Sequence, residues 1–565
     1  MDQDQAGPLL SVRDVTYTYR EAAAPALRGV SFDLAPGELL VVMGASGAGK
    51  STLCRCLNGI IPNFLHGALG GQVLALGRDT RETSVADCSR HVGLVFQDFE
   101  AQLFATNVEL EVAFGAENLG VPRGEIRARV RDLLRMVGLS HLAARRPHSL
   151  SGGEKQRLAI AAALAAGPSV LVLDEATSDL DPVGKASVFG LARQLTTAAG
   201  RGVVFAHHDA EEAVRATTVL LLSEGRVAAV DTPARVLSQP DLLEANGVAP
   251  LAATSVFAAL RLDERPLEDT DAAERLLARN LRIDGRAVAR WEDSDRTRGS
   301  YGDPVIEVRG VTHAYGLGNA AIADIDLTIR RGEFVAIIGQ NGSGKTTLVK
   351  HFNGLLRPTS GEVFIAGQPT RGHSLRTLAA QVGYVFQNPD HQIFAPNVFE
   401  EVAFGPRNFG LEEEEVRARV SESLAAVGLI GREEEDPFSL TKGERQRVAA
   451  ASVLAGRPEV LIFDEPTTGL DDRESRSMMA LIDQLNRRGH TIVVVTHSMW
   501  LAAEYARRVV VMQVGRITLD APTRTAFSRR EELRRTAIIP PQVVRLSQLL
   551  GGTALTVAEL VEALR

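Results

Sequence analysis

The second half of this chain repeats the first. A glycine-rich octapeptide at residues 44–51, GASGAGKS, recurs at residues 339–346 as GQNGSGKT. Further matches follow in the same order: VFQ at 95–97 recurs at 385–387, and VAFG at 112–115 recurs at 402–405, each after an interval of 290 residues. A repeat of that length is a whole domain rather than a small solenoid unit. The sequence therefore predicts two copies of one large domain within 565 residues.

The composition is that of an ordinary globular protein. Hydrophobic residues make up 45%, charged residues 23%, and the net charge is -8, so nucleic acid is not an expected partner. No stretch approaches the roughly 20 consecutive apolar residues of a transmembrane helix. The N-terminus, MDQDQ, is acidic and polar where a signal peptide would be basic and then apolar. We expect a cytosolic protein whose membrane functions, if any, go through partners.

The three cysteines, Cys54, Cys56 and Cys88, form neither a disulfide framework nor a zinc pattern. Cys54 and Cys56 are two residues apart in an expected helix, so their side chains point in different directions. We interpret them as packing residues.

The apolar pattern predicts an α/β fold. In each half a β-rich stretch (10–34 and 306–329) precedes a short apolar run that ends at glycine, as a buried parallel strand feeding a phosphate-binding loop would. Apolar residues at helical spacing follow, and they predict an inserted helical subdomain. Further apolar runs read as core strands. Strands separated by helices are typical of an α/β fold. The helical patterns lie at 126–137 and 416–427, and the later strands at 170–173, 203–205, 460–463 and 492–495.

A charge-rich, turn-prone stretch at 261–303 separates the halves and is interpreted as a linker. At the C-terminus, apolar residues at helical spacing between 543 and 550 predict a helix, either docked on its own domain or involved in pairing. The expected organisation is a first domain at 8–245, a short helical tail and charged linker at 246–303, a second domain at 304–527, and a C-terminal helical tail at 528–565.

The two glycine-rich segments have the chemistry of phosphate-binding loops. Glycines let successive backbone N–H groups face phosphate oxygens, and a lysine neutralises their charge, here Lys50 and Lys345. The following hydroxyl residue, Ser51 or Thr346, ligates Mg²⁺. Each loop follows an apolar strand, so both are predicted nucleotide sites.

The motifs downstream resemble those of ATP-binding cassette (ABC) ATPases over almost the whole of both halves. They are LSGGEKQR at 150–157, the Asp-Glu pairs at 174–175 and 464–465, the turns SDLD at 178–181 and TGLD at 468–471, and His208 and His497. The resemblance implies two tandem P-loop ABC ATPase domains. Each would have a RecA-like α/β core, an antiparallel β subdomain and an inserted helical subdomain, with ATP and Mg²⁺ as cofactors.

The resemblance also assigns roles. Glu175 and Glu465 would polarise the attacking water, with His208 and His497 bracing it and the γ-phosphate; His207 has no counterpart and is interpreted as structural. The metal residues would be Ser51, Gln97, Asp174, Thr346, Gln387 and Asp464. The ATP-binding residues would be Tyr19, Gly44, Ala45, Ser46, Gly47, Ala48, Gly49, Lys50, Ser51, Thr52, Ser151, Gly152, Gly153, Glu154, Asp181, Tyr315, Gly339, Gln340, Asn341, Gly342, Ser343, Gly344, Lys345, Thr346, Thr347, Thr441, Lys442, Gly443, Glu444 and Asp471.

In the family, two domains pair head to tail, so that the phosphate loop of one faces the signature motif of the other. The second signature departs from the pattern, because Lys442 stands where the first has Gly152. If that position requires a positive φ, a lysine costs on the order of 1 kcal/mol. We expect two unequal ATP sites.

The segments after Gln97 and Gln387 resemble the ATPases of energy-coupling factor (ECF) importers. In that family, two ATPases, here fused, join a transmembrane coupling subunit and a small substrate-binding membrane subunit at the cytoplasmic face of the membrane. The cargo is a vitamin, a vitamin precursor or a metal ion, and fused pairs resemble those serving thiamine-precursor uptake. A set of apolar residues would line grooves for the coupling helices or belong to the core: Phe99, Leu103, Phe104, Ile393 and Phe394.

The alternative is a soluble twin-cassette ATPase acting on ribosomes or nucleic acid. Translation factors of that type tend to carry a long basic linker, whereas residues 261–303 hold nine arginines against eleven acidic residues. The long coiled coil of repair ATPases and the cysteine-rich region of ribosome-recycling proteins are absent from the sequence.

Overall fold

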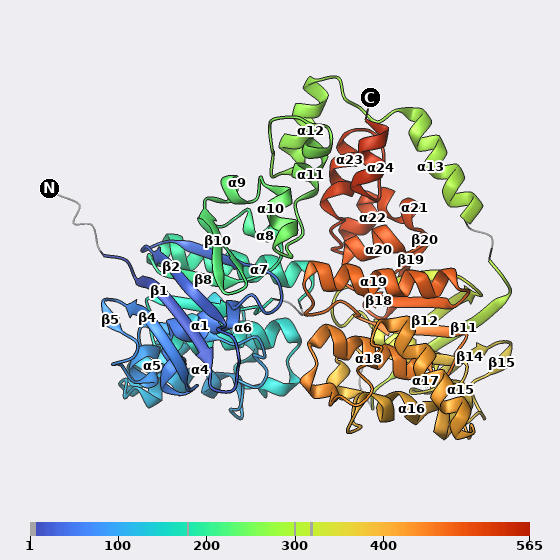
Figure 1. Cartoon of the computed structure of the whole chain (residues 1–565), viewed down its shortest axis with the longest axis horizontal. Coiled ribbons are helices and arrows are strands. Elements are labelled where there is room, and N and C mark those ends of the chain that lie inside the picture. The colour runs from blue at the N-terminus through green and yellow to red at the C-terminus, as the bar shows by residue number, and fades with distance from the viewer. Residues whose placement is uncertain (1–6, 178–179, 299–300, 317–319, 565) are drawn as a thin grey trace. The chain divides into compact units, whose positions relative to one another are not determined.

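The computed structural model describes residues 7–177, 180–298, 301–316 and 320–564. The chain divides into two compact units, Met1–Leu267 and Glu268–Arg565 (Figure 1). Each unit contains one four-stranded antiparallel sheet and one six-stranded, mostly parallel sheet, so the structure shows the duplication that the sequence predicts. The predicted fold class is confirmed.

The six-stranded sheet of the first unit has the order β10-β9-β3-β8-β7-β6. Strands β9, β3, β8, β7 and β6 are parallel, and only β10 is antiparallel to its neighbour. Both faces of this sheet are covered, which explains why β3, β7 and β8 are apolar and buried along their whole length. The strands are β3 (Leu39–Met43), β6 (Val92–Val95), β7 (Val170–Asp174), β8 (Gly202–Ala206), β9 (Thr218–Ser223) and β10 (Arg226–Asp231).

The antiparallel sheet of the first unit has the order β2-β1-β4-β5. On β2 the residues Leu27, Val30, Phe32 and Leu34 are buried, which is the alternation expected of a sheet with one face on the core. The strands are β1 (Leu10–Tyr19), β2 (Leu27–Leu34), β4 (Gly67–Ala75) and β5 (Arg78–Asp79).

Helices α4, α5 and α6 pack on one another and form the predicted helical subdomain of the first unit. Its apolar stripe, Ile126, Val130, Leu133 and Leu134 on α5, is buried. The helices of this unit are α1 (Lys50–Leu57), α2 (Ile60–Asn63), α3 (Val85–Ser89), α4 (Val108–Asn118), α5 (Arg123–Met136), η1 (Ser140–Leu142), η2 (Pro147–Ser149), α6 (Gly152–Ala165), α7 (Pro182–Ala199), α8 (Ala210–Ala213), α9 (Pro233–Val236), α10 (Pro240–Ala245) and α11 (Ala252–Ala259).

The second unit repeats this plan, with sheet orders β12-β11-β14-β15 and β16-β17-β18-β13-β19-β20. Helices α16, α17 and α18 form its helical subdomain. Its strands are β11 (Pro304–Ala314), β12 (Ala320–Arg330), β13 (Phe334–Gly339), β14 (Ser360–Ile365), β15 (Gln368–Pro369), β16 (Val382–Val385), β17 (Val460–Asp464), β18 (Thr491–Thr496), β19 (Arg508–Gln513) and β20 (Arg516–Pro522). Its helices are α12 (Asp269–Ala278), α13 (Gly285–Arg298), α14 (Lys345–Phe352), α15 (Leu375–Ala379), η3 (Pro389–His391), α16 (Val398–Asn408), α17 (Glu413–Val427), η4 (Pro437–Ser439), α18 (Lys442–Leu454), α19 (Asp472–Arg487), α20 (Met499–Tyr505), α21 (Thr523–Ser528), α22 (Arg530–Arg535), α23 (Gln542–Leu549) and α24 (Val557–Ala563).

Most of the expected linker is helical. Helices α12 and α13 fall within 261–303, and they belong to the second unit, where α12 packs on α23 and α13 on α24. Ala272, Ala273 and Leu276 form the buried side of α12, while charged residues face solvent, so the charge-rich composition concealed two amphipathic helices. The C-terminal tail thus packs on the segment that precedes the second domain. The domain boundaries themselves stay a prediction.

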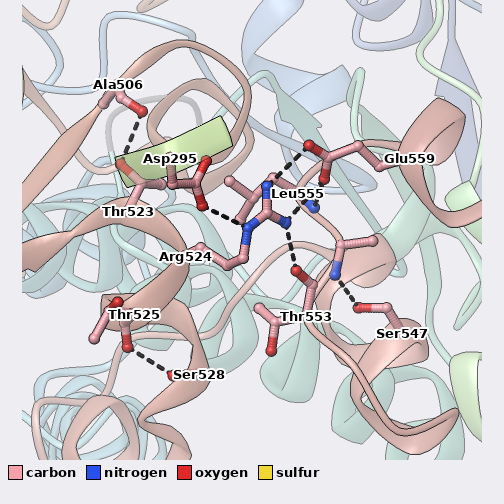
Figure 2. Close-up of polar contacts among 11 residues, drawn as sticks. Asp295, Ala506, Thr523, Arg524, Thr525, Ser528, Ser547, Thr553, Leu555 and Glu559 are labelled. Atoms are coloured by element: carbon pink, nitrogen blue, oxygen red, sulfur yellow. Dashed lines mark hydrogen bonds and ion pairs between the residues drawn. The ribbon is translucent and has the colours of Figure 1, made fainter. Parts of the chain in front are cut away.

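A buried arginine joins these segments (Figure 2). Arg524 on α21 is 8% exposed and donates to Asp295 on α13 at 2.7 Å and to both carboxylate oxygens of Glu559 on α24 at 3.0 Å. It also donates to the Thr553 carbonyl at 2.7 Å and lies 5.0 Å from the Trp291 ring centroid. A desolvated guanidinium requires such compensation, and breaking a buried pair commonly costs about 3–5 kcal/mol. Arg524 therefore fixes α13 and α24 on the second domain.

Candidate functional site

Each glycine-rich loop ends at a glycine that no other residue could replace without strain. Gly49 and Gly344 are the N-caps of α1 and α14, with φ of 102° and 98°. A Cβ at Gly49 would lie 2.6 Å from the Ala26 carbonyl oxygen, and one at Gly344 would lie 2.8 Å from the Ala321 carbonyl oxygen. Since glycine alone tolerates both the left-handed φ and the close approach, the loops can turn sharply into the helix N-terminus, where backbone amides favour an anion.

The loop lysines fold back over their own loops. Lys50 Nζ donates to the Gly44 and Ala45 carbonyls at 2.9 and 3.0 Å, and Lys345 Nζ donates to the Gly339 and Gln340 carbonyls at 2.8 and 3.0 Å. Both lysines are 6% exposed. Each ammonium group is thus held inside the curve of its loop, where the backbone amides would also contact phosphate oxygens. The other loop residues predicted to bind ATP, Ser46, Gly47, Ala48, Asn341, Gly342 and Ser343, lie in the same two turns.

A hydroxyl and a carboxylate meet at the start of each helix. Ser51 Oγ donates to Asp174 Oδ1 at 2.8 Å, and Thr346 Oγ1 donates to Asp464 Oδ1 at 3.3 Å. Burial raises the pKa of Asp174 to about 6, against the opposing effect of the Ser51 hydrogen bond, and burial likewise raises the pKa of Asp464. Oxygen ligands of this kind suit Mg²⁺, whose charge would also favour the ionised carboxylates. Ser51 with Asp174, and Thr346 with Asp464, therefore fit the cofactor.

The glutamates that follow these aspartates share an unusual backbone. Glu175 and Glu465 have φ of 47° and 50°, in the left-handed region that non-glycine residues avoid. Their amides donate to the Ala206 and Val495 carbonyls of the adjacent strands, which holds the conformation in place. Strain of this kind costs about 1–3 kcal/mol and concentrates at functional sites.

The side-chain contacts of the two glutamates differ. Glu175 pairs with Lys50 at 3.1 Å and accepts from Gln97 Nε2 at 3.0 Å. Glu465 lies 2.8 Å from His497 Nδ1 and accepts from Thr496 Oγ1 at 3.3 Å. Burial alone would raise the pKa of Glu465, but His497 reverses the direction and the pKa is lowered. Gln387, the counterpart of Gln97, is exposed just beyond β16.

The histidines occupy equivalent places after β8 and β18. Burial, with a further contribution from Lys185, lowers the pKa of His208, so its neutral form is favoured. His207 is fully buried, with ring centroids 5.4 Å from Phe205 and 5.6 Å from Phe189. It packs among aromatic side chains.

Two tyrosines flank the loops. The Tyr19 hydroxyl lies 3.0 Å from Thr52 Oγ1 and that of Tyr315 lies 3.3 Å from Thr347 Oγ1, and Tyr315 is 56% exposed. The tyrosines therefore stand beside the first turns of α1 and α14, where an adenine ring could stack on them.

The signature residues cap helices. Ser151 and Thr441 are the N-caps of α6 and α18, and each forms a capping box with the glutamate three residues on, Glu154 or Glu444. Asp181 and Asp471 likewise cap α7 and α19. Ser178 and Asp179, from the same turn as Asp181, lie outside the described residues.

The expected cost of Lys442 is not found. Lys442 and Gly152 are the first residues of α18 and α6, and neither has a positive φ, because a helix start requires ordinary helical dihedrals. A Cβ at Gly152 would meet nothing within 4 Å, so a side chain is accommodated there. In the second unit the Lys442 ammonium group occupies the space that a Cβ at Gly469 would need. The asymmetry is therefore one of charge and side-chain volume, not of backbone strain.

The apolar residues after Gln97 and Gln387 fall into two groups. Phe99 and Ile393 are 6% and 4% exposed and belong to the core, and Leu103 packs partly buried against it. Phe104 and Phe394 are 63% and 62% exposed. Each is the edge-to-face partner of an exposed ring on the next helix, Phe114 on α4 or Phe404 on α16, at centroid distances of 4.6 and 4.8 Å.

Sequence reasoning missed the residues that hold these aromatic pairs. Glu111 and Glu401 are each 3% exposed. Glu111 accepts from the amides of Phe104 and Ala105 at 2.9 and 2.7 Å, and Glu401 from those of Phe394 and Ala395 at 3.0 and 2.9 Å. A carboxyl group this deeply buried needs hydrogen-bond partners, and these amides supply them. This glutamate is the first residue of EVAFG in both halves, and that repetition was the sequence signal that could have identified it.

Within each unit, the structure brings together the loop lysine, the hydroxyl residue, the aspartate and the glutamate at the carboxyl ends of parallel strands. This arrangement defines a P-loop nucleoside triphosphatase. The family model described as ABC transporter matches residues 27–178 and 322–468. The chain belongs to the ABC transporter family: it is an ATPase that uses ATP with Mg²⁺.

Known proteins resemble the whole chain or one half of it. A protein of Caldanaerobacter subterraneus named "Putative ABC transporter ATP-binding protein" is 47% identical over 97% of this chain and 98% of its own length. The solved structure of cbiO1 from Clostridium perfringens, part of the ABC transporter complex cbiONQ, is 35% identical over 44% of this chain and 99% of that one, with a TM-score of 0.39. The cassette MJ0796, a dimer bound to ADP and Pi, is 31% identical over 39% of this chain and 99% of that one, with a TM-score of 0.36.

Proposed function

We propose that this chain is the ATP-hydrolysing subunit of an ECF-type importer, and that it energises uptake of a vitamin, a vitamin precursor or a metal ion. The observation that carries the proposal is the pair of exposed aromatic contacts, Phe104 with Phe114 and Phe394 with Phe404, at equivalent places in the two halves. Large exposed apolar side chains held on a buried anchor are typical of a protein contact. Among the described residues, no helix is long and apolar enough to cross a membrane. The membrane-spanning subunits would therefore be partner chains.

The proposed partners are a transmembrane coupling subunit and a small substrate-binding membrane subunit, with this chain peripheral at the cytoplasmic face. Coupling helices would contact the aromatic pairs next to Gln97 and Gln387. Lys155 on α6 pairs with Glu100 at 2.8 Å, and Arg445 on α18 pairs with Asp390 at 2.7 Å. These ion pairs join the segment after each glutamine to the signature helix, and they supply a short route from the partner contact to the ATP-binding motifs.

The proposed chemistry is in-line attack of water on the γ-phosphate. Lys50 and Lys345 would neutralise phosphate charge, and Glu175 and Glu465 would orient and polarise the water, with His208 and His497 bracing it. Ser51 with Asp174, and Thr346 with Asp464, would hold Mg²⁺, which supplies charge neutralisation for the β- and γ-phosphates. By family membership, we propose that the two domains pair head to tail, so each phosphate loop works with the signature of the other half.

Purification of the tagged full-length chain from native membranes tests the proposal. We expect it to retain two integral membrane proteins and to hydrolyse ATP. Identification of the small molecule retained by that complex would name the cargo. Recovery of ribosomes or nucleic acid in place of membrane proteins would contradict the importer and favour a twin-cassette factor.

A further inference from the structure

Tyr384 contacts the carboxylate of the second nucleotide site. It lies on β16 and is 8% exposed. Its hydroxyl donates to Asp464 Oδ2 at 2.6 Å, while Thr346 donates to the other oxygen, Oδ1, at 3.3 Å. Both oxygens of this aspartate are therefore held by neutral donors. An O–H donor to a carboxylate at this distance is a short, charge-assisted hydrogen bond.

The first half has no hydroxyl at this place. Leu94 on β6 is paired with Val172 on β7, just as Tyr384 on β16 is paired with Ile462 on β17. The two residues are therefore at equivalent positions. Each is paired with the residue that lies two positions before the aspartate on the neighbouring strand. Leu94 is 7% exposed and purely apolar. The two candidate metal sites accordingly differ in how their aspartates are held.

Packing alone would not place the tyrosine in this way. A buried Tyr hydroxyl needs some hydrogen-bond partner, but a backbone carbonyl would satisfy it as well. Here the partner is a carboxylate that is itself 3% exposed and adjacent to Glu465. The Tyr384 ring is fixed in turn, since its centroid lies 5.1 Å from that of Phe386 in an edge-on contact. The phenol is thus a rigid donor aimed at one oxygen.

We propose that Tyr384 is a positioning residue for the Mg²⁺ site of the second half, and that it makes this site bind the metal more tightly than the site of Asp174. The hydrogen bond to Oδ2 fixes the rotation of the Asp464 carboxylate, so less ordering is required when the metal binds. Groups that orient a metal-binding side chain commonly contribute 10–100-fold to metal affinity. The inference rests on the proposed role of Asp464.

The test uses the full-length chain, with Mn²⁺ as the probe and its binding followed by electron paramagnetic resonance at saturating ATP. The wild-type chain should show two Mn²⁺ affinities. Tyr384→Phe should weaken the tighter one about tenfold. ATP binding without metal, measured with a fluorescent ATP analogue, should be unchanged. Leu94→Phe is the matched control at the equivalent strand position, and it should leave the tighter affinity as in the wild type.

Two further variants separate the outcomes. Asp464→Asn should abolish the tighter Mn²⁺ site; if both sites persist, the role of Asp464 fails and the inference fails with it. If Asp464→Asn removes the site but Tyr384→Phe leaves its affinity unchanged, the role of Tyr384 is overturned while the metal site stands. Leu94→Tyr should tighten the weaker site. If Tyr384→Phe does not fold, an unchanged affinity in Leu94→Tyr overturns the inference.

Discussion

The glutamates show at the residue scale how one motif acquires two environments. Glu175 and Glu465 have the same left-handed backbone, which places both carboxylates beside the phosphate loop. Their partners differ although most neighbouring residues are the same; the exception is Thr496 in the second half, which corresponds to His207 in the first, at the matching level of β18 and β8. The pairing of Glu465 with His497 at 2.8 Å resembles a base with its orienting group.

Substitution at the second site should separate chemistry from binding. Glu465→Gln removes the carboxylate that would polarise water, so hydrolysis at this site should fall about 10²-fold or more while ATP remains bound there. Lys345→Ala should weaken ATP binding itself, because a cation next to the phosphates is lost. Turnover of bound ATP and equilibrium binding of a fluorescent analogue measure the two effects. Unchanged turnover in Glu465→Gln would remove Glu465 from the catalytic role.

Asp174 should make the stability of the metal-free protein depend on pH. Its pKa is raised to about 6 in the folded state and is ordinary when unfolded, so the unfolded chain loses the proton first. Folding stability should therefore fall as pH rises from about 4 to about 6, by about 3 kcal/mol in total, and stay level above that. Asp174→Asn should raise the Tm more at pH 8 than at pH 5. An equal gain at both pH values would contradict the burial argument.

Much of the residue-level site could be predicted from the sequence. The lysines, hydroxyl residues and acidic pairs each belong to a short sequence motif, and each motif occurs in both halves. The contacts between motifs could not be predicted, because Tyr384 and Asp464 are 80 residues apart and meet only through strand pairing. The φ of Lys442 was also out of reach, since a motif does not say whether its glycine sits in a turn or at a helix start.

At the element scale, helices with a charged surface were the hardest to predict. Helix α13 presents Ala287 and Trp291 to the core within a run of charged residues, and it is held by Asp295 through Arg524. Two or three buried apolar residues per helix give too weak a period to distinguish such a helix from a linker. The strands were easier, because a strand covered on both faces is apolar throughout.

The aromatic pairs are an element-scale feature, since α4 and α16 supply both the buried glutamate and the second ring. Phe104→Asp with Phe394→Asp should release the chain from the membrane partners that we propose and leave ATP binding intact, because both rings are mostly exposed. Co-purification from membranes and the Tm measure the two effects. Phe64→Asp, at a phenylalanine that is 74% exposed, is the control and should keep the partners. Loss of folding in the double variant would indicate that the rings serve the core.

For the whole molecule, duplication followed by divergence has left the second half with a distinct set of features. Lys442 replaces Gly152 at the signature helix, Tyr384 replaces Leu94 beside the metal aspartate, and His497 pairs with Glu465. A lysine in the first turn of α18 opposes the helix dipole, at a cost of about 0.3–1 kcal/mol, although it adds a positive charge where a phosphate could approach.

The two ATP sites of the assembled transporter should therefore hydrolyse at different rates. In the head-to-tail pairing that we propose, the site of Lys345 and Glu465 would use the intact signature of Ser151, Gly152 and Gly153, and it also has the Tyr384 contact. In the same pairing, the site of Lys50 and Glu175 would be closed by the signature that contains Lys442. Glu465→Gln should then remove most of the ATPase activity and uptake, whereas Glu175→Gln should reduce both only in part, because its site is the slower one. Both sites keep a glutamate and a histidine, so neither is expected to be inactive.

Parallel measurement of ATPase rate and uptake in the two variants makes the comparison, with Lys442→Gly in each background as the control that restores the intact signature. Equal losses in Glu175→Gln and Glu465→Gln would show that the divergence of the second half has no consequence for turnover.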